Sequence, residues 1–188
     1  MPGPTLLLAA AVASLSALPA QAQQLLLPAQ SDIRFVSRQM GVPVEGRFKQ
    51  FTAQVAFDPK KPEAGKIGFT IQTGSASFGA AETDAEVPKP AWFNVAKFPQ
   101  ATFQSSAIKA LGGGKFEVSG TLAIKGNTQA VVVPVTITQA GAASTAAGSF
   151  LIKRLDFKIG EGEWADTSMV ANDVQVKFKL ALSGMAPL

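Results

Sequence analysis

The chain has 188 residues, a net charge of +4 and neither cysteine nor histidine. The absence of cysteine excludes disulfides, and the absence of histidine excludes a Ser-His-Asp triad, a Cys-His pair and imidazole metal ligands. Lys and Arg are scattered, with no basic run between aromatic residues, so no nucleic-acid site is predicted. Attraction of the positive chain to an anionic membrane surface stays open, with little support in the sequence.

The first 22 residues have the pattern of a secretory signal. Residues 6–13 are apolar, and Ala20-Gln21-Ala22 is a small-residue cleavage site. The apolar run is too short to span a bilayer as a stable helix. No Lys or Arg precedes it, and a short N-terminal anchor is the alternative. We expect export with cleavage after Ala22, which leaves one domain over residues 23–188.

Apolar and polar residues alternate along most of the mature chain, which is typical of half-buried antiparallel strands. A change of parity near Lys49-Gln50 indicates a bulge or a bend. Residues 81–100 and 154–171 break the pattern, and the first of these predicts a short helix around Ala91–Lys97. The alternating segments are residues 33–38, 44–57, 67–73, 115–138, 148–154 and 172–182. About eight strands at this spacing predict an all-β barrel or sandwich with one or two short helices.

Residues 115–138 predict a hairpin with one dry face. Gly126-Asn127 is a two-residue turn signal, and pairing of Lys125 with Thr128 places Val133 opposite Gly120. Pro134 cannot donate a ladder hydrogen bond, so one side of the second strand is expected to be unpaired there.

A barrel of about eight strands either fills its interior or holds one slender ligand. The inward-facing set is rich in Phe and also contains Gly46, Ala53, Gly120 and Gly148. Both alternatives stay open, and in the second the missing side chain of Gly120 is space for the ligand. The candidate lining residues are Phe35, Phe48, Phe69, Ile71, Phe103, Phe116, Val118, Gly120, Leu122, Ile124, Val133, Val135, Phe150, Val176 and Phe178.

Two clusters of carboxylates are the candidates for other chemistry. Glu161, Glu163 and Asp166 lie near Trp164, and a carboxyl beside an aromatic ring could act as an acid or base. A solvated acidic loop is the simpler interpretation. The carboxylates at residues 82–86 lack the later Glu of a calcium loop. We therefore predict no catalytic residue, no metal site and no cofactor.

Four stretches, in this order, resemble the YceI-like family of exported lipid-binding proteins. They are residues 31–51, 97–106, 116–135 and 152–178. The resemblance implies a lipocalin-like antiparallel barrel, a periplasmic location and a polyisoprenoid chain in the pore, such as the tail of a quinone or of an undecaprenyl-type carrier. The chain departs from the family at Arg38, where many relatives carry histidine, and at Ser77-Phe78.

The expected function is sequestration or transport of an isoprenoid lipid or quinone, with transient membrane contact and no bond made or broken. Two alternatives stay open. One is a carboxylate-dependent enzyme that acts on a lipid, and the other is a non-binding accessory protein to a membrane redox partner. The sequence does not decide between a monomer and a homodimer.

Overall fold

The computed structural model describes residues 23–188. The predicted signal at residues 1–22, with its cleavage site after Ala22, lies outside the described residues. Within residues 23–188 the chain forms eleven strands, one short α-helix and five 3-10 turns. None of the helices in this part of the chain reaches the length and hydropathy needed to cross a bilayer.

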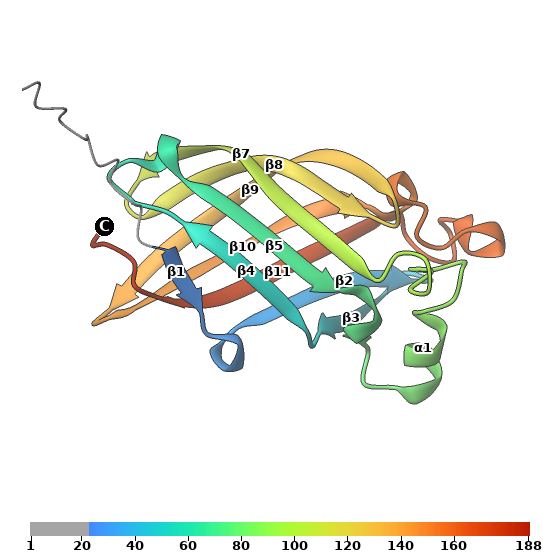
Figure 1. Ribbon diagram of the computed structural model, residues 1–188. Helices are drawn as coiled ribbons and strands as arrows, with labels where there is room; N and C mark the ends of the chain where they lie inside the picture. The colour runs from blue at the N-terminus through green and yellow to red at the C-terminus, as the bar shows by residue number, and fades with distance from the viewer. Residues whose placement is uncertain (1–22) are drawn as a thin grey trace, which may run out of the picture.

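Eight of the described strands close into an antiparallel barrel, which confirms the predicted all-β fold (Figure 1). β1 closes the ring, because it pairs with β4 on one side and with β11 on the other. In order around the ring the strands are β1 (Gln23–Leu26), β4 (Phe51–Ala56), β5 (Lys66–Gln72), β7 (Gln100–Gly112), β8 (Lys115–Ile124), β9 (Asn127–Ala140), β10 (Ala143–Lys153) and β11 (Asp173–Ser183).

The other described strands, β2 (Asp32–Gln39), β3 (Val42–Phe48) and β6 (Ala76–Ser77), continue the sheet from β11. β2 pairs with residues 175–179 of β11, whereas β1 pairs with residues 182–183. β3 and β4 are separate strands, divided by residues 49 and 50. The change of parity predicted a bulge or a bend at this point. The β2–β3 turn, helix α1 (Ala81–Glu86), residues 88–98 and residues 154–171 gather at one end of the barrel, called here the helix end (Figure 1).

The hairpin of β8 and β9 is confirmed, but its predicted turn and register are wrong. The two turn residues are Lys125 and Gly126, so Ile124 pairs with Asn127. Their φ angles are 50° and 75°, and two-residue hairpin turns favour positive φ at both positions. The side-chain amide of Asn127 donates to the Lys125 carbonyl at 2.9 Å. The register is therefore shifted by two residues, which keeps each side chain on its predicted face.

Small residues on the inner face make room for neighbouring aromatic rings. Three of them, Gly46, Gly148 and Ala53, are each paired across the sheet with a phenylalanine. A Cβ added at Gly46 or Gly148 would overlap the ring of that phenylalanine. The pairs are Gly46 with Phe35, Gly148 with Phe178, and Ala53 with Phe69. These positions therefore add little open space to the interior.

Gly120 is also covered, so the prediction that its missing side chain is ligand space is wrong. It pairs with Val131 rather than with Val133. A Cβ there would lie 2.5 Å from the Gln104 carbonyl oxygen and 2.6 Å from the Phe103 ring. β7 is bulged beside this point. Glycine allows β7 and the Phe103 ring to approach β8 closely.

The predicted helix at Ala91–Lys97 is also wrong, because this segment forms a series of turns. Asn94 has a φ of 49°, which ends any helical run. The Trp92 amide donates to the Lys89 carbonyl, and the Lys97 amide donates to the Asn94 carbonyl. The α-helix of the described chain lies earlier, at α1.

The ladder between β9 and β10 is short, as Pro134 predicted. Residues 136–140 pair with residues 143–147, and the pairing stops two residues before Pro134. Residues 127–135 pair with β8 alone among the described strands. The wall of the barrel therefore has an unpaired stretch toward the helix end.

Candidate functional site

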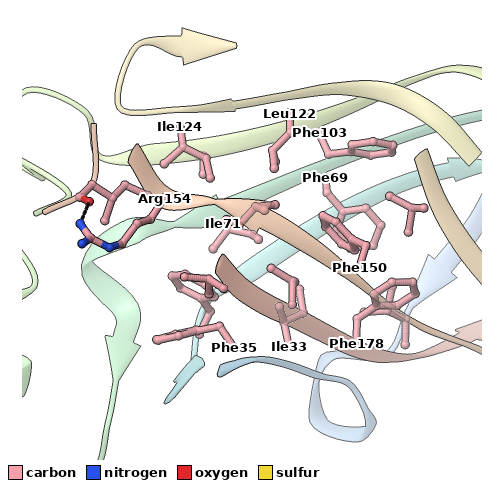
Figure 2. A pocket seen from close by; sticks show the side chains of 18 of the residues that line it. Ile33, Phe35, Phe69, Ile71, Phe103, Leu122, Ile124, Phe150, Arg154 and Phe178 are labelled. Carbon is pink, nitrogen blue, oxygen red and sulfur yellow. Dashed lines mark hydrogen bonds between the residues drawn. The ribbon is translucent and has the colours of Figure 1, made fainter. Parts of the chain in front are cut away.

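An apolar cavity of about 540 Å³ occupies the barrel (Figure 2). Its lining extends from Phe57 and Met185 to Gln39 and Glu82 at the helix end. All predicted lining residues except Gly120 border it. They are Phe35, Phe48, Phe69, Ile71, Phe103, Phe116, Val118, Leu122, Ile124, Val133, Val135, Phe150, Val176 and Phe178.

The cavity is closed at the end away from α1. Phe57 and Phe116 meet edge to face there, with 5.1 Å between ring centroids. Both side chains are buried, and so is Ile108, which packs in the same cluster. The opening of the cavity is therefore at the helix end.

Polar lining residues occur at the helix end. They are Ser37, Gln39, Glu82, Thr83, Glu86 and Arg154. Glu82 is exposed and also lines the cavity, so the opening lies beside it. We call this opening the mouth, and it is bordered by Gln39, Glu82, Glu86 and Trp164. Ser37 and Gln39 continue the inward parity of β2, and that signal could have identified them; the α1 residues gave no such signal.

Helix α1 is fixed at the mouth by Asp84. Its carboxylate accepts hydrogen bonds from the Phe78 amide at 2.6 Å and from the Ser77 hydroxyl at 2.8 Å. Both hydrogen bonds lower the pKa of Asp84 below its ordinary value, and the bond from the Phe78 backbone has the larger effect. Asp84 thus connects α1 to β6. In the described part of the chain, no three Asp or Glu side chains are placed to hold a metal ion together.

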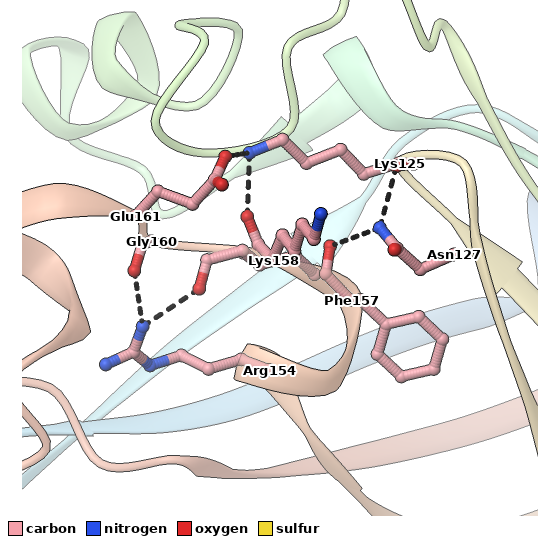
Figure 3. Close-up of polar contacts among 8 residues, drawn as sticks. Lys125, Asn127, Arg154, Phe157, Lys158, Gly160 and Glu161 are labelled. Atoms are coloured by element: carbon pink, nitrogen blue, oxygen red, sulfur yellow. Dashed lines mark hydrogen bonds and ion pairs between the residues drawn. The ribbon is translucent and has the colours of Figure 1, made fainter.

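Arg154 organises the loop that crosses the helix end. Its side chain is 2% exposed, and its five N–H groups donate to five backbone carbonyls (two are drawn in Figure 3). The acceptors are the carbonyls of Ile159 (2.8 Å), Gly160 (3.1 Å), Trp164 (2.7 Å), Val170 (2.6 Å) and Ala171 (3.0 Å). Burial lowers the pKa of Arg154, but a guanidinium stays protonated in proteins. With every donor used, Arg154 is a structural residue of the mouth rather than a free anion-binding group.

A second anchor joins this loop to the β8–β9 turn. The Lys125 ammonium donates to a Glu161 carboxylate oxygen and to the Lys158 carbonyl, each at 2.7 Å (Figure 3). Its side chain is 5% exposed, whereas that of Glu161 is 50% exposed. The hydrogen bond from Lys125 lowers the pKa of Glu161. Glu161 is therefore an ionised salt-bridge partner.

Two of the three carboxylates in the predicted acidic cluster, Glu161 and Asp166, have lowered pKa values. Hydrogen bonds from the Ser168 hydroxyl and amide lower the pKa of Asp166. A general acid near neutral pH needs a raised pKa, and the shifts at Glu161 and Asp166 have the opposite sign.

Both tryptophans of the chain line the cavity at the helix end. The Trp92 and Trp164 ring centroids lie 5.5 Å apart. The Trp92 indole nitrogen is buried without a hydrogen-bond partner among the described residues. Sequence reasoning placed Trp164 beside the carboxylates but found no reason to bring the two rings together.

The positions that depart from the family pattern have different surroundings. Arg38 is exposed on β2 and donates to the Gly41 carbonyl at 3.3 Å. Phe78 lines the cavity and meets the Phe35 ring edge to face at 5.2 Å.

The sequence comparisons identify one family. The model of the YceI-like domain matches residues 25–182. A UPF0312 protein of Azotobacter vinelandii is 38% identical over 88 residues, and Protein YceI of Salmonella arizonae is 40% identical over 88 residues. Each alignment covers 47% of this chain and 46% of the relative. The chain thus spans about half the length of the curated relatives it matches.

The structural comparisons find the same architecture. The crystal structure of Burkholderia cenocepacia BcnA is 47% identical, with a TM-score of 0.81 over 83% of this chain and 98% of that one. A polyisoprenoid binding domain from Saccharophagus degradans, implicated in plant cell wall breakdown, is 19% identical. Its TM-score of 0.69, over 89% of this chain and 100% of that one, shows the shared fold alone. Because the domain model matches nearly all of the described residues, the chain belongs to the YceI-like family.

Proposed function

We propose that the protein is exported to the periplasm, binds the chain of one polyisoprenoid lipid or quinone in its barrel and carries it between membranes. The observation that supports this most is the cavity of about 540 Å³, which has apolar walls, a closed inner end and a polar mouth. Pockets for one small ligand typically measure about 300–1,000 Å³. The fold shared with a polyisoprenoid binding domain supports the class of ligand.

Burial of hydrocarbon is the source of affinity in this proposal. About ten buried methylene groups contribute about 8 kcal/mol, at about 0.8 kcal/mol each. Ordering of the ligand removes several kcal/mol of this. The walls select a chain by its width and length, because the polar groups are confined to the mouth. Selectivity for the head group is accordingly expected to be weak.

The proposal contains no catalytic step. The lowered pKa values of Glu161 and Asp166 argue against acid catalysis by the loop that holds them. These carboxylates keep the loop in place beside the mouth.

Organic extraction of the purified protein, followed by mass spectrometry, tests the proposal. We expect an intact prenyl lipid at close to one molecule per protein. A lipid with altered chemistry would indicate an enzyme, and protein folded but free of lipid after export would contradict carriage. N-terminal sequencing of the exported form tests the processing, with a mature start expected after Ala22.

A further inference from the structure

We propose that the mouth docks directly on a lipid bilayer through three exposed apolar side chains, and that this docking does not depend on anionic lipid. The side chains are Met40, Val42 and Met169, called here the apolar tip. The inference rests on the proposed function, because a lipid cargo is taken from and returned to a bilayer.

The apolar tip lies at the edge of the mouth, where the β2–β3 turn meets the loop of residues 154–171. Met40, Val42 and Met169 are 76%, 62% and 46% exposed. The Met40 amide donates to the Met169 carbonyl at 2.8 Å, which joins the β2–β3 turn to the loop of residues 154–171. The residues next to them, Gln39 and Val170, pair with each other, and both line the cavity. The apolar tip therefore directly borders the cavity opening.

This position gives the exposed side chains a physical role. A hydrocarbon chain that leaves the cavity through water exposes apolar surface on the way. With the apolar tip inserted among lipid acyl chains, the cavity wall is continuous with the bilayer interior. Exposed apolar residues that occur singly need no such explanation, but three of them at the rim of an apolar cavity do.

The charge at the mouth argues against attraction to anionic lipid. Residues 81–97 and 154–171 hold seven of the 13 Asp and Glu residues of the chain, but only four of its 17 Lys and Arg residues. Arg38, which contacts Gly41 of the β2–β3 turn, and Lys125, which contacts Glu161, raise the number of basic residues here to six. The helix end is therefore close to neutral and lacks the positive charge of the chain as a whole. Apolar contact, rather than charge, has to hold the mouth on a membrane.

Vesicle flotation with two lipid compositions tests this inference. We expect the protein to bind vesicles of phosphatidylcholine at least as well as vesicles that also contain phosphatidylglycerol. Because Trp164 borders the mouth, phosphatidylcholine with brominated acyl chains should quench its fluorescence. The triple variant Met40→Asn, Val42→Ser, Met169→Ser should weaken binding about tenfold. Asn is chosen because Met40 has a φ of 47°.

The double variant Leu25→Ser, Leu111→Ser is the matched control. These side chains are 66% and 53% exposed and lie on β1 and β7, away from the helix end. The control should bind vesicles as the parent does, and circular dichroism should show both variants folded. Equal loss in both variants, or stronger binding with phosphatidylglycerol, would overturn the inference. Failure of the parent to float, with prenyl lipid still recovered by extraction, would overturn docking and leave the proposed function intact.

Discussion

Replacement of Gly120 by alanine is expected to destabilise the barrel without emptying it. The added Cβ would lie 2.5 Å from the Gln104 carbonyl oxygen and 2.6 Å from the Phe103 ring. The carbonyl belongs to the β7 backbone, so it cannot swing away as the end of a side chain does. Overpacking of this kind costs about 1–3 kcal/mol. For a domain of this size, that corresponds to a fall in melting temperature of about 2–12 °C.

The matched control is Gly68→Ala on β5. The only neighbour that its Cβ would approach is the flexible side chain of Gln104, at 3.2 Å. Alanine in place of a strand glycine also lowers the entropy of the unfolded chain, so we expect a change of about 0 to 1 kcal/mol in the stabilising direction. Thermal melting of both variants and the parent gives the comparison.

Lipid extracted per mole of folded protein completes the test. Gly120→Ala should retain the lipid content of the parent, because Gly120 does not border the cavity. A variant that melts with the parent but has lost its lipid would refute this reasoning and restore the interpretation of Gly120 as ligand space.

Three further changes test the cavity and its mouth. Ala146→Phe projects a ring into the cavity and should at least halve the extracted lipid, whereas Ala147→Phe, on the opposite face of β10, should not. The Lys125–Glu161 pair lowers the pKa of Glu161 from 4.5. The contribution of the pair to stability is therefore complete above pH 4.5 and is lost as the pH falls through the lowered pKa. In urea unfolding from pH 6 to pH 3, the Glu161→Gln variant should lose less stability than the parent. Arg154→Lys leaves two of five carbonyls without a donor and should cost about 2–6 kcal/mol in urea unfolding, and an unchanged midpoint would contradict the structural role of the guanidinium.

Alternation along the sequence predicted the inner face of the barrel because side-chain direction in a strand depends only on parity. A register error of two residues in the β8–β9 hairpin left these faces unchanged. The register itself depended on Lys125 adopting a positive φ, and nothing in its residue type signals this. Alternation along the strands therefore predicted which residues line the cavity, whereas the geometry of the turn was found only in the structure.

Two further errors concern contacts that alternation along a strand does not reveal. The space beside Gly120 is filled by Phe103, from a different strand, so composition alone made the glycine look like a gap. Arg154 gave no signal because its five partners are backbone carbonyls spread over residues 159–171. Such a role becomes visible only when the loop is folded.

The short ladder between β9 and β10 makes the barrel wall unequally compliant. β8 and β9 share ten residue pairs and β10 and β11 share eleven, but β9 and β10 share five. Val133 and Phe150, on the two sides of the unpaired stretch, both line the cavity. Separation of the strands along this line breaks no ladder hydrogen bond, whereas separation of β8 from β9, or of β10 from β11, breaks several. The girth of the barrel near the mouth can therefore adjust to its occupant without loss of ladder hydrogen bonds along this line.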